Sequence, residues 1–389
     1  MNPPTTASAQ PRILYMAPDL SDPAVARRLT MLKAGGAKVT VSGFLRGNAS
    51  PPPADWKAES LGRTQDAALG QRALMVAWRL LNPVALRRRV RSQDAVLARN
   101  LEMLVLAWCG LLLAGSDARL CYEVLDIHRV MLGDGLKSRL LRRVEAALLK
   151  RVDLLVISSK AFDRAYFQRL QPLPAPRLLL ENKVLSLDDA PASTPPPPPP
   201  PPQSEGPPWR IGWFGMLRCR RSLELLGRLA ASRPGLVQVD LRGRPSPAVF
   251  GDDFSAAVAQ WPGLTYHGPY KASDLPSAYG AVHLVWAIDF YEAGQNSDWL
   301  LPNRLYEGAA HGRPLLALRG VETGRWLEER GAGILMDDVE SELETTLDKM
   351  SMERYRLSRD AVDGLAPADL FATRRDCREL VKALTELPE

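Results

Sequence analysis

Residues 209–241 read WRIGWFGMLRCRRSLELLGRLAASRPGLVQVDL, and this stretch decides the fold class. A short apolar run at 209–214 is followed by a helical pattern at 221–232 and by a second apolar run at 236–241. A strand, a helix and a strand of these lengths form a unit whose two strands lie parallel in one sheet. The stretch therefore predicts a parallel sheet covered by helices.

The same alternation of short apolar runs and helical patterns continues on both sides of this stretch. Further strands are predicted at residues 13–16, 38–43, 95–98, 120–125, 154–157, 177–180, 281–286, 314–318 and 333–335. A helix from about 22 to 34 ends at two glycines, and the C-terminal residues 353–387 have a helical pattern. We predict an α/β protein with two doubly wound, Rossmann-like domains.

Length and one proline-rich stretch set the domain organisation. The 389 residues exceed the usual size of a single core. Residues 190–208, with eight consecutive prolines at 195–202, are excluded from helices and central strands. We interpret them as a linker, and a ligand for a proline-binding domain is the alternative. Ligands of parallel sheets bind at the carboxyl ends of the strands, so we expect the two domains to face each other across a cleft.

The composition excludes several classes of protein. With 46% hydrophobic and 24% charged residues, the chain is neither collagen, coiled coil nor wholly disordered. Its four cysteines lack CxxC spacing and its four histidines lack metal-site spacing, which favours a reducing compartment and no metal centre. The longest apolar run, 103–115, is shorter than the about twenty residues of a membrane span and predicts a buried helix.

Charge is distributed unevenly. Residues 1–190 hold 28 Lys and Arg against 17 Asp and Glu, a net of +11, and the remainder has 22 against 27, a net of −5. The basic half is suited to an anionic surface, either nucleic acid or membrane. Residues 72–91 mix apolar side chains with six arginines, which is typical either of a helix on an anionic leaflet or of an ordinary solvated helix.

Arginines crowd the beginning of the helix predicted after the 209–214 strand. Gly215 ends the strand, and Arg218, Arg220 and Arg221 follow. Cations at a helix N-terminus oppose the helix dipole unless an anion is also present. A diphosphate would resolve this conflict, whereas a solvated basic loop is the alternative.

A second candidate site begins at residue 302. Pro302 suits the first position of a helix, and the leucine before it cannot accept the hydrogen bonds of a cap, which leaves room for phosphate at Asn303 and Arg304. Arg304 and Glu307 share one helix face. We predict that Arg304 binds phosphate and that Glu307 accepts hydrogen bonds from sugar or ribose hydroxyls. A surface ion pair between the two residues is the alternative.

Polar side chains also follow the strands of the basic half. Asp126 and His128 come after the strand at 120–125, and Arg99 and Asn100 lie at the tip of the strand at 95–98. Such strand ends face the ligand. A histidine there donates a hydrogen bond or acts as acid or base near neutral pH, although a loop histidine without a special role is the alternative.

The order of these motifs resembles that of GT-B-fold glycosyltransferases of the large retaining family 4. Residues 306–316, YEGAAHGRPLL, resemble the family's glutamate-bearing helix, and Arg221 stands at the place of its phosphate-binding lysine. Trp299 occupies the position of another frequent glutamate, as in a branch with the Pro-x-Arg-x-x-Glu pattern of 302–307. The opening residues look most like transferases that build bacterial exopolysaccharides of the succinoglycan type.

The resemblance implies transfer of a sugar from a nucleotide-sugar donor to a lipid-linked or saccharide acceptor, with retention of configuration and domain closure. The acceptor-side domain would be 1–189, the linker 190–208, the donor domain 209–350, and the helices of 351–389 would pack back on the first domain. The implied roles are catalytic for His128 and Glu307, donor-binding for Gly215, Arg218, Arg221, Asn303, Arg304 and Glu307, and acceptor-side for Arg99, Asn100 and Asp126.

No Asp-x-Asp motif is present, so we expect no metal and no cofactor besides the nucleotide sugar itself. The resemblance favours an anionic membrane over nucleic acid as the partner of the basic half, and a cytoplasmic enzyme peripheral to the inner face of the membrane. One alternative is a sugar-nucleotide epimerase of the same fold. A non-catalytic basic scaffold that binds membrane or nucleic acid is another.

Overall fold

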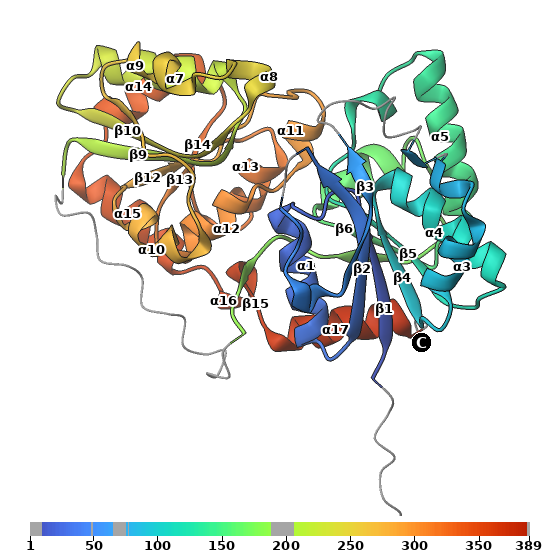
Figure 1. The fold of residues 1–389 in the computed structure, drawn as a ribbon. Coiled ribbons are helices and arrows are strands. Elements are labelled where there is room, and N and C mark those ends of the chain that lie inside the picture. The colour runs from blue at the N-terminus through green and yellow to red at the C-terminus, as the bar shows by residue number, and fades with distance from the viewer. Residues whose placement is uncertain (1–9, 48–49, 65–74, 77, 188–205, 387–389) are drawn as a thin grey trace, which may run out of the picture. The chain divides into compact units, whose positions relative to one another are not determined.

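The computed structural model describes residues 10–47, 50–64, 75–76, 78–187 and 206–386. Figure 1 shows the chain, which divides into two compact units. Unit 1 comprises Met1–Leu180 and Ala372–Glu389, and unit 2 comprises Glu181–Phe371. Most of the predicted linker at 190–208 lies outside the described residues.

The described part of unit 1 is built on a seven-stranded parallel sheet of order β3-β2-β1-β4-β5-β6-β7. Its strands are β1 (Arg12–Ala17), β2 (Lys38–Arg46), β3 (Ala58–Thr64), β4 (Ala95–Arg99), β5 (Arg119–Val124), β6 (Leu154–Ile157) and β7 (Arg177–Leu179). The longer helices are α1 (Pro23–Ala34), α3 (Pro83–Val90), α4 (Asn100–Ala114), α5 (Leu136–Leu149) and α17 (Arg374–Thr385), and the shorter ones are η1 (Ala54–Trp56), η2 (Arg129–Met131), α6 (Lys160–Phe162) and η3 (Asp163–Phe167). The strand order reverses at β1 and β4, which makes a topological switch point.

Side-chain alternation along β5 assigns the helices to two faces of this sheet. Arg119 donates to the carbonyl of Ala383 in α17, at 2.8 Å, and Glu123 pairs with α1. Tyr122, between them, points the other way and donates to Glu145 of α5, at 2.9 Å. The helices α1 and α17 therefore cover one face, and α5 covers the other together with its neighbours α4 and α3.

The long apolar run forms the predicted core helix α4. Met103, Leu104, Ala107 and Leu111 are buried, while the last turn leaves Leu112 exposed. Among the described residues, no helix is long and apolar enough to cross a bilayer.

Unit 2 holds, in its described part, a six-stranded parallel sheet of order β11-β10-β9-β12-β13-β14. Its strands are β9 (Trp209–Leu217), β10 (Val237–Pro245), β11 (Leu264–Tyr266), β12 (Leu284–Trp286), β13 (Leu315–Leu318) and β14 (Ile334–Met336). Its helices are α7 (Arg220–Ser232), α8 (Pro247–Phe250), α9 (Phe254–Ala259), η4 (Ala272–Asp274), α10 (Leu275–Gly280), α11 (Asn296–Trp299), α12 (Asn303–Ala310), α13 (Glu322–Glu328), α14 (Val339–Asp348), α15 (Met352–Asp363) and α16 (Pro367–Leu370). One hydrophobic cluster packs around Trp209 and Trp213, and another around Phe214 and Val285.

The predicted α/β class with parallel sheets is confirmed, but several elements escaped the sequence pattern. The edge strands β3 and β11 were missed because each carries few apolar residues. The short pair β8 (Val184–Leu185) and β15 (Phe371–Ala372) was missed as well. The helical pattern at 353–387 breaks at Gly364 and Pro367, since proline cannot continue a helix. Only α17 belongs to unit 1, while α15 and α16 stay in unit 2.

We expect Gly35→Ala to loosen α17. A Cβ atom at residue 35 would lie 2.2 Å from the carbonyl oxygen of Cys377 in α17, a distance at which the backbone must move. The expected cost is about 2 kcal/mol of unfolding free energy, with faster amide exchange in α17. Gly320→Ala, where a Cβ meets nothing within 4 Å, is the matched control. Equal stability of the two variants would contradict the packing.

Candidate functional site

In unit 2, two arginines and one aspartate gather where β9 and β12 end. Arg218 follows β9, Asp289 follows β12, and Arg304 lies in the first turn of α12. Arg218 Nη2 is 3.2 Å from Asp289 Oδ2, and its guanidinium stacks on the ring of Tyr291 at 5.0 Å. Arg304 Nη2 donates to the carbonyl of Ile288, at 3.1 Å. Parallel strands bring these residues to the same sheet edge.

Arg304 is a buried cation influenced by charges of both signs. It is buried, and burial lowers the pKa of its guanidinium; the negative charge of Asp289 raises that pKa, and the positive charge of Arg218 lowers it. The buried Nε of Arg304 has no hydrogen-bond partner within the described ranges. An unpaired donor on a buried cation is costly, and an anion bound nearby would stabilise the charge of this guanidinium.

Glu307 lies one helical turn after Arg304 and is held by a buried phenol. The Tyr279 hydroxyl donates to Glu307 Oε2, at 2.9 Å. Burial, and next the charge of Glu307, raise the pKa of Tyr279, so the phenol stays a donor at neutral pH. The same two causes raise the pKa of Tyr270. The carboxylate is thereby fixed in orientation and suited to accept hydrogen bonds from hydroxyl groups.

The helix that carries Arg304 and Glu307 starts one residue later than predicted. Pro302 is its N-cap, not its first residue, and Asn303 opens the helix on the surface. Pro302 makes no side-chain capping hydrogen bond, because proline, like the Leu301 expected at this position, has no oxygen in its side chain.

The structure does not pair Arg221 with Arg304. Arg221 instead pairs with Glu340 of α14, at 3.0 Å, and stacks on Phe290 at 4.3 Å. Among the arginines of this segment, Arg218 is the one whose positive charge acts measurably on the pKa of Arg304. Gly215 is not the end of its strand, because β9 continues to Leu217; its φ of 109° is one that glycine adopts readily.

Asp289 was missed by sequence reasoning. It comes three residues after the end of β12, in the same kind of position that singled out Asp126 after β5. The signal was therefore a carboxylate following a buried strand, and the strand itself had been predicted at 281–286.

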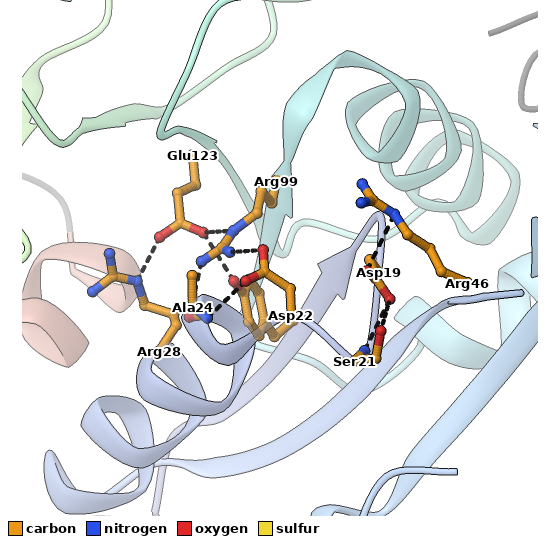
Figure 2. Close-up of polar contacts among 9 residues, drawn as sticks. Asp19, Ser21, Asp22, Ala24, Arg28, Arg46, Arg99 and Glu123 are labelled. Atoms are coloured by element: carbon orange, nitrogen blue, oxygen red, sulfur yellow. Dashed lines mark hydrogen bonds and ion pairs between the residues drawn. The ribbon is translucent and has the colours of Figure 1, made fainter. Parts of the chain in front are cut away.

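In unit 1, Glu123 is the centre of a buried polar network, which Figure 2 shows. Its carboxylate accepts from Arg28 Nε at 2.5 Å, from Arg99 Nε at 2.8 Å and from the Tyr15 hydroxyl at 3.0 Å. Asp22, at the N-cap of α1, lies 3.6 Å from Arg99 Nη1. Burial by itself would raise the pKa of Glu123, but the charges of Arg28 and Arg99 and their hydrogen bonds bring it to about 2.

This network determines what Arg99 and Asn100 do. The Arg99 side chain is only 3% exposed and is held by Glu123, so it positions the end of β4 and does not present its guanidinium to a ligand. Asn100, the next residue, starts α4 with a φ of 66°, a conformation uncommon outside glycine. The network thus fixes the backbone turn from which Asn100 projects.

Asp126 and His128 are both exposed after β5. His128 Nδ1 accepts from the amide of Val130, at 3.2 Å, and thereby caps the short helix η2. Because Nδ1 acts as acceptor, the proton of the neutral imidazole resides on Nε2. Within the residues that the structure describes, no three His, Cys, Asp or Glu side chains gather as a metal site would require.

Solved structures share this fold over nearly the whole chain. Anabaena Alr3699/HepE, solved in complex with UDP and glucose, has a TM-score of 0.66 at 16% identity and covers 96% of this chain and 98% of its own. WaaG, a glycosyltransferase involved in lipopolysaccharide biosynthesis, has a TM-score of 0.61 at 13% identity and covers 96% and 99%. The fold is that of the GT-B glycosyltransferases.

A curated relative identifies the family. The succinoglycan biosynthesis protein ExoL of Rhizobium meliloti (strain 1021) is 44% identical in an alignment 388 residues long, which covers 97% of this chain and 94% of that protein. The chain belongs to the family of ExoL. No protein-family model matches it.

We expect Glu123→Gln to destabilise unit 1 by about 3–5 kcal/mol, because the two arginines would remain buried without a counter-charge. Chemical denaturation measures the loss. Asp22→Asn is the matched control, since it removes a half-exposed partner of Arg99 and keeps a capping oxygen; its cost should stay below about 1 kcal/mol.

The same experiment has a pH readout. The lowered pKa of about 2 means that Glu123 stabilises the wild type fully above its unfolded value near 4.5 and loses this effect as the pH falls towards 2. The stability gap between wild type and Glu123→Gln should therefore narrow across this window. A gap independent of pH would contradict the ionised network.

Proposed function

We propose that the protein is a glycosyltransferase that moves a sugar from a nucleotide-sugar donor to a lipid-linked or saccharide acceptor in bacterial exopolysaccharide synthesis. The observation that carries this proposal is the Arg218–Asp289–Arg304 cluster with its unpartnered buried Nε. Membership of the ExoL family supports the pathway, and the GT-B fold supports the class of reaction. Since HepE was solved with UDP, UDP is the first nucleotide to test.

In this proposal Arg218 and Arg304 bind the diphosphate of the donor. Both are cations at the carboxyl edge of a parallel sheet, and arginine binds phosphate oxygens through two parallel hydrogen bonds. As the sugar leaves, negative charge grows on the diphosphate, and two arginines already in position stabilise it without reorganisation. This supplies the charge compensation that a metal would otherwise give, and we propose a metal-independent reaction.

Glu307 accepts hydrogen bonds from ribose or sugar hydroxyls, with its carboxylate oriented by Tyr279. His128 acts on the sugar through Nε2, as donor to a hydroxyl or as acid or base. Asn100 and Asp126 serve the acceptor in unit 1. Retention of configuration is part of the proposal and rests on the resemblance to family 4.

We further propose that the enzyme works in the cytoplasm as a peripheral protein at the inner face of the membrane, where a lipid-linked acceptor would lie. The basic N-terminal half supports this placement. The epimerase alternative is weaker, because membership of the ExoL family supports biosynthetic transfer.

Arg218→Ala and Arg304→Lys should each weaken UDP binding by about ten- to hundredfold, since each removes charge-assisted hydrogen bonds to phosphate. Isothermal titration calorimetry with UDP and UDP-glucose measures the change. Arg228→Ala, an exposed arginine further along α7, is the matched control and should bind like the wild type. Because Arg218 is partly exposed, Arg218→Ala should fold normally. Wild-type UDP affinity in this variant would overturn the donor site.

Turnover tests the absence of a metal. Transfer of labelled sugar to a membrane extract that carries lipid-linked saccharides should proceed at an unchanged rate in excess EDTA. The reason is that Arg218 and Arg304 supply the positive charge that a metal ion would otherwise give. Loss of transfer that is restored by Mg²⁺ or Mn²⁺ would contradict metal independence and leave the UDP-binding result intact.

A further inference from the structure

The helix α5 of unit 1 exposes a row of apolar side chains. Leu136 is 80% exposed, Leu140 is 61% and Val144 is 38%, and they recur every fourth residue. Residues four apart lie above one another on one helix face. Isolated exposed leucines are ordinary on a protein surface, but a row along one helix is a feature that needs an explanation.

Cations border this row on both sides. At about 100° per residue, the exposed Arg139 and Arg143 fall on one side of the row and the exposed Lys137 on the other. Lys150 and Arg151 extend the positive charge beyond the end of the helix, and both are exposed. We call this surface, made of Leu136, Lys137, Arg139, Leu140, Arg143 and Val144, the α5 face.

Helix α5 contributes no acidic side chain to the α5 face. The one acid in α5, Glu145, is buried on the opposite side, where it accepts from Tyr122, Tyr166 and Gln171. The nearest acid before the helix is Asp134, which is exposed. Lys137, Arg139 and Arg143 therefore have no counter-charge within α5, and their positive charge is directed to the surroundings of unit 1.

Neighbouring helices add exposed apolar groups on the same face of the sheet. Leu112 and Leu113 end α4, which packs beside α5. Trp78 and Leu81 precede α3 in the chain and Val84 lies in its first turn; all three are exposed, and α3 packs on α4. The last three belong to residues 72–91, the segment for which the sequence suggested a membrane helix; residues 72–74 and 77 of it lie outside the described part of the chain.

An apolar row with cations on both sides matches the chemistry of an anionic bilayer surface. The leucines enter the boundary between headgroups and acyl chains, while the lysine and arginines remain at the level of the phosphates. Each cation near such a surface adds to the attraction. A protein partner would instead have to supply a matching apolar groove with acids on both sides.

We propose that the α5 face docks unit 1 on a bilayer that contains anionic phospholipid, with the helix lying in the plane of the surface. The proposal rests on the proposed function, in which a lipid-linked acceptor lies at the membrane, and it assigns the contact to α5, a segment that the sequence pattern did not single out.

The test is flotation of the full chain with two kinds of vesicle, phosphatidylcholine alone and phosphatidylcholine with phosphatidylglycerol. The wild type should bind the anionic vesicles at least tenfold more tightly than the neutral ones, and added salt should weaken binding. Leu136→Ser with Leu140→Ser, and separately Arg139→Glu with Arg143→Glu, should each reduce binding at least tenfold. These residues are exposed, so both double variants should keep the wild-type melting temperature.

Leu357→Ser is the matched control. Leu357 is 63% exposed on α15 of unit 2, a helix with three arginines and three acids, so this variant should bind vesicles like the wild type. Equal binding of both vesicle types, or an equal loss in all variants, would overturn the proposal. A dimer in light scattering that Leu140→Ser dissociates, without vesicle binding, would overturn it in favour of self-association.

UDP affinity, measured without vesicles, separates this proposal from the proposed function. Both double variants should bind UDP like the wild type, because the donor residues lie in unit 2. Failure of vesicle binding with intact UDP binding refutes the α5 face alone, whereas failure of UDP binding in the wild type refutes the donor site alone.

Discussion

Parallel strand pairing is the constraint on which the sites of this protein depend. When all strands of a sheet run the same way, their carboxyl ends meet at one edge, and residues far apart in sequence become neighbours there. In unit 2 this brings Arg218, Asp289 and Arg304 together from two strand ends and a helix start. In unit 1 it joins Tyr15, Arg99 and Glu123 from three strands.

The two units use the same elementary group, a carboxylate near two arginines, in opposite ways. Around Glu123 the carboxylate is buried, accepts three hydrogen bonds and is fully ionised, so its oxygens are occupied by protein donors and it holds the backbone of β4 in place. Around Asp289, Arg218 is partly exposed and Arg304 keeps an unpartnered donor. The arginines around Glu123 are enclosed and stabilise structure, whereas the partly exposed Arg218 is suited to receive a ligand.

The sheet of unit 1 also separates two tasks by face. On one face, Arg119 of β5 anchors the C-terminal helix α17, and Glu123 pairs with Arg28 of α1. Even-numbered residues meet α5, whose buried side supplies Glu145 and whose other side is the α5 face. Because the one acid of α5 is buried, all charged side chains on the outer side of this helix are cationic. The spacing of residues along the helix therefore determines both the packing of its inner side and the charge of its outer side.

The sequence alone determined the α/β class, the strands with strong apolar runs and the two motifs around Arg218 and Arg304, because periodicity and strand ends are local signals. It missed β3 and β11, whose pairing compensates for a weak pattern. Only the tertiary structure decided that Arg218 pairs with Asp289 and Arg221 with Glu340, that the charges of Arg218 and Asp289 act on Arg304, and that Arg99 is buried. Side-chain partners depend on which strands become neighbours, and local sequence does not encode that adjacency.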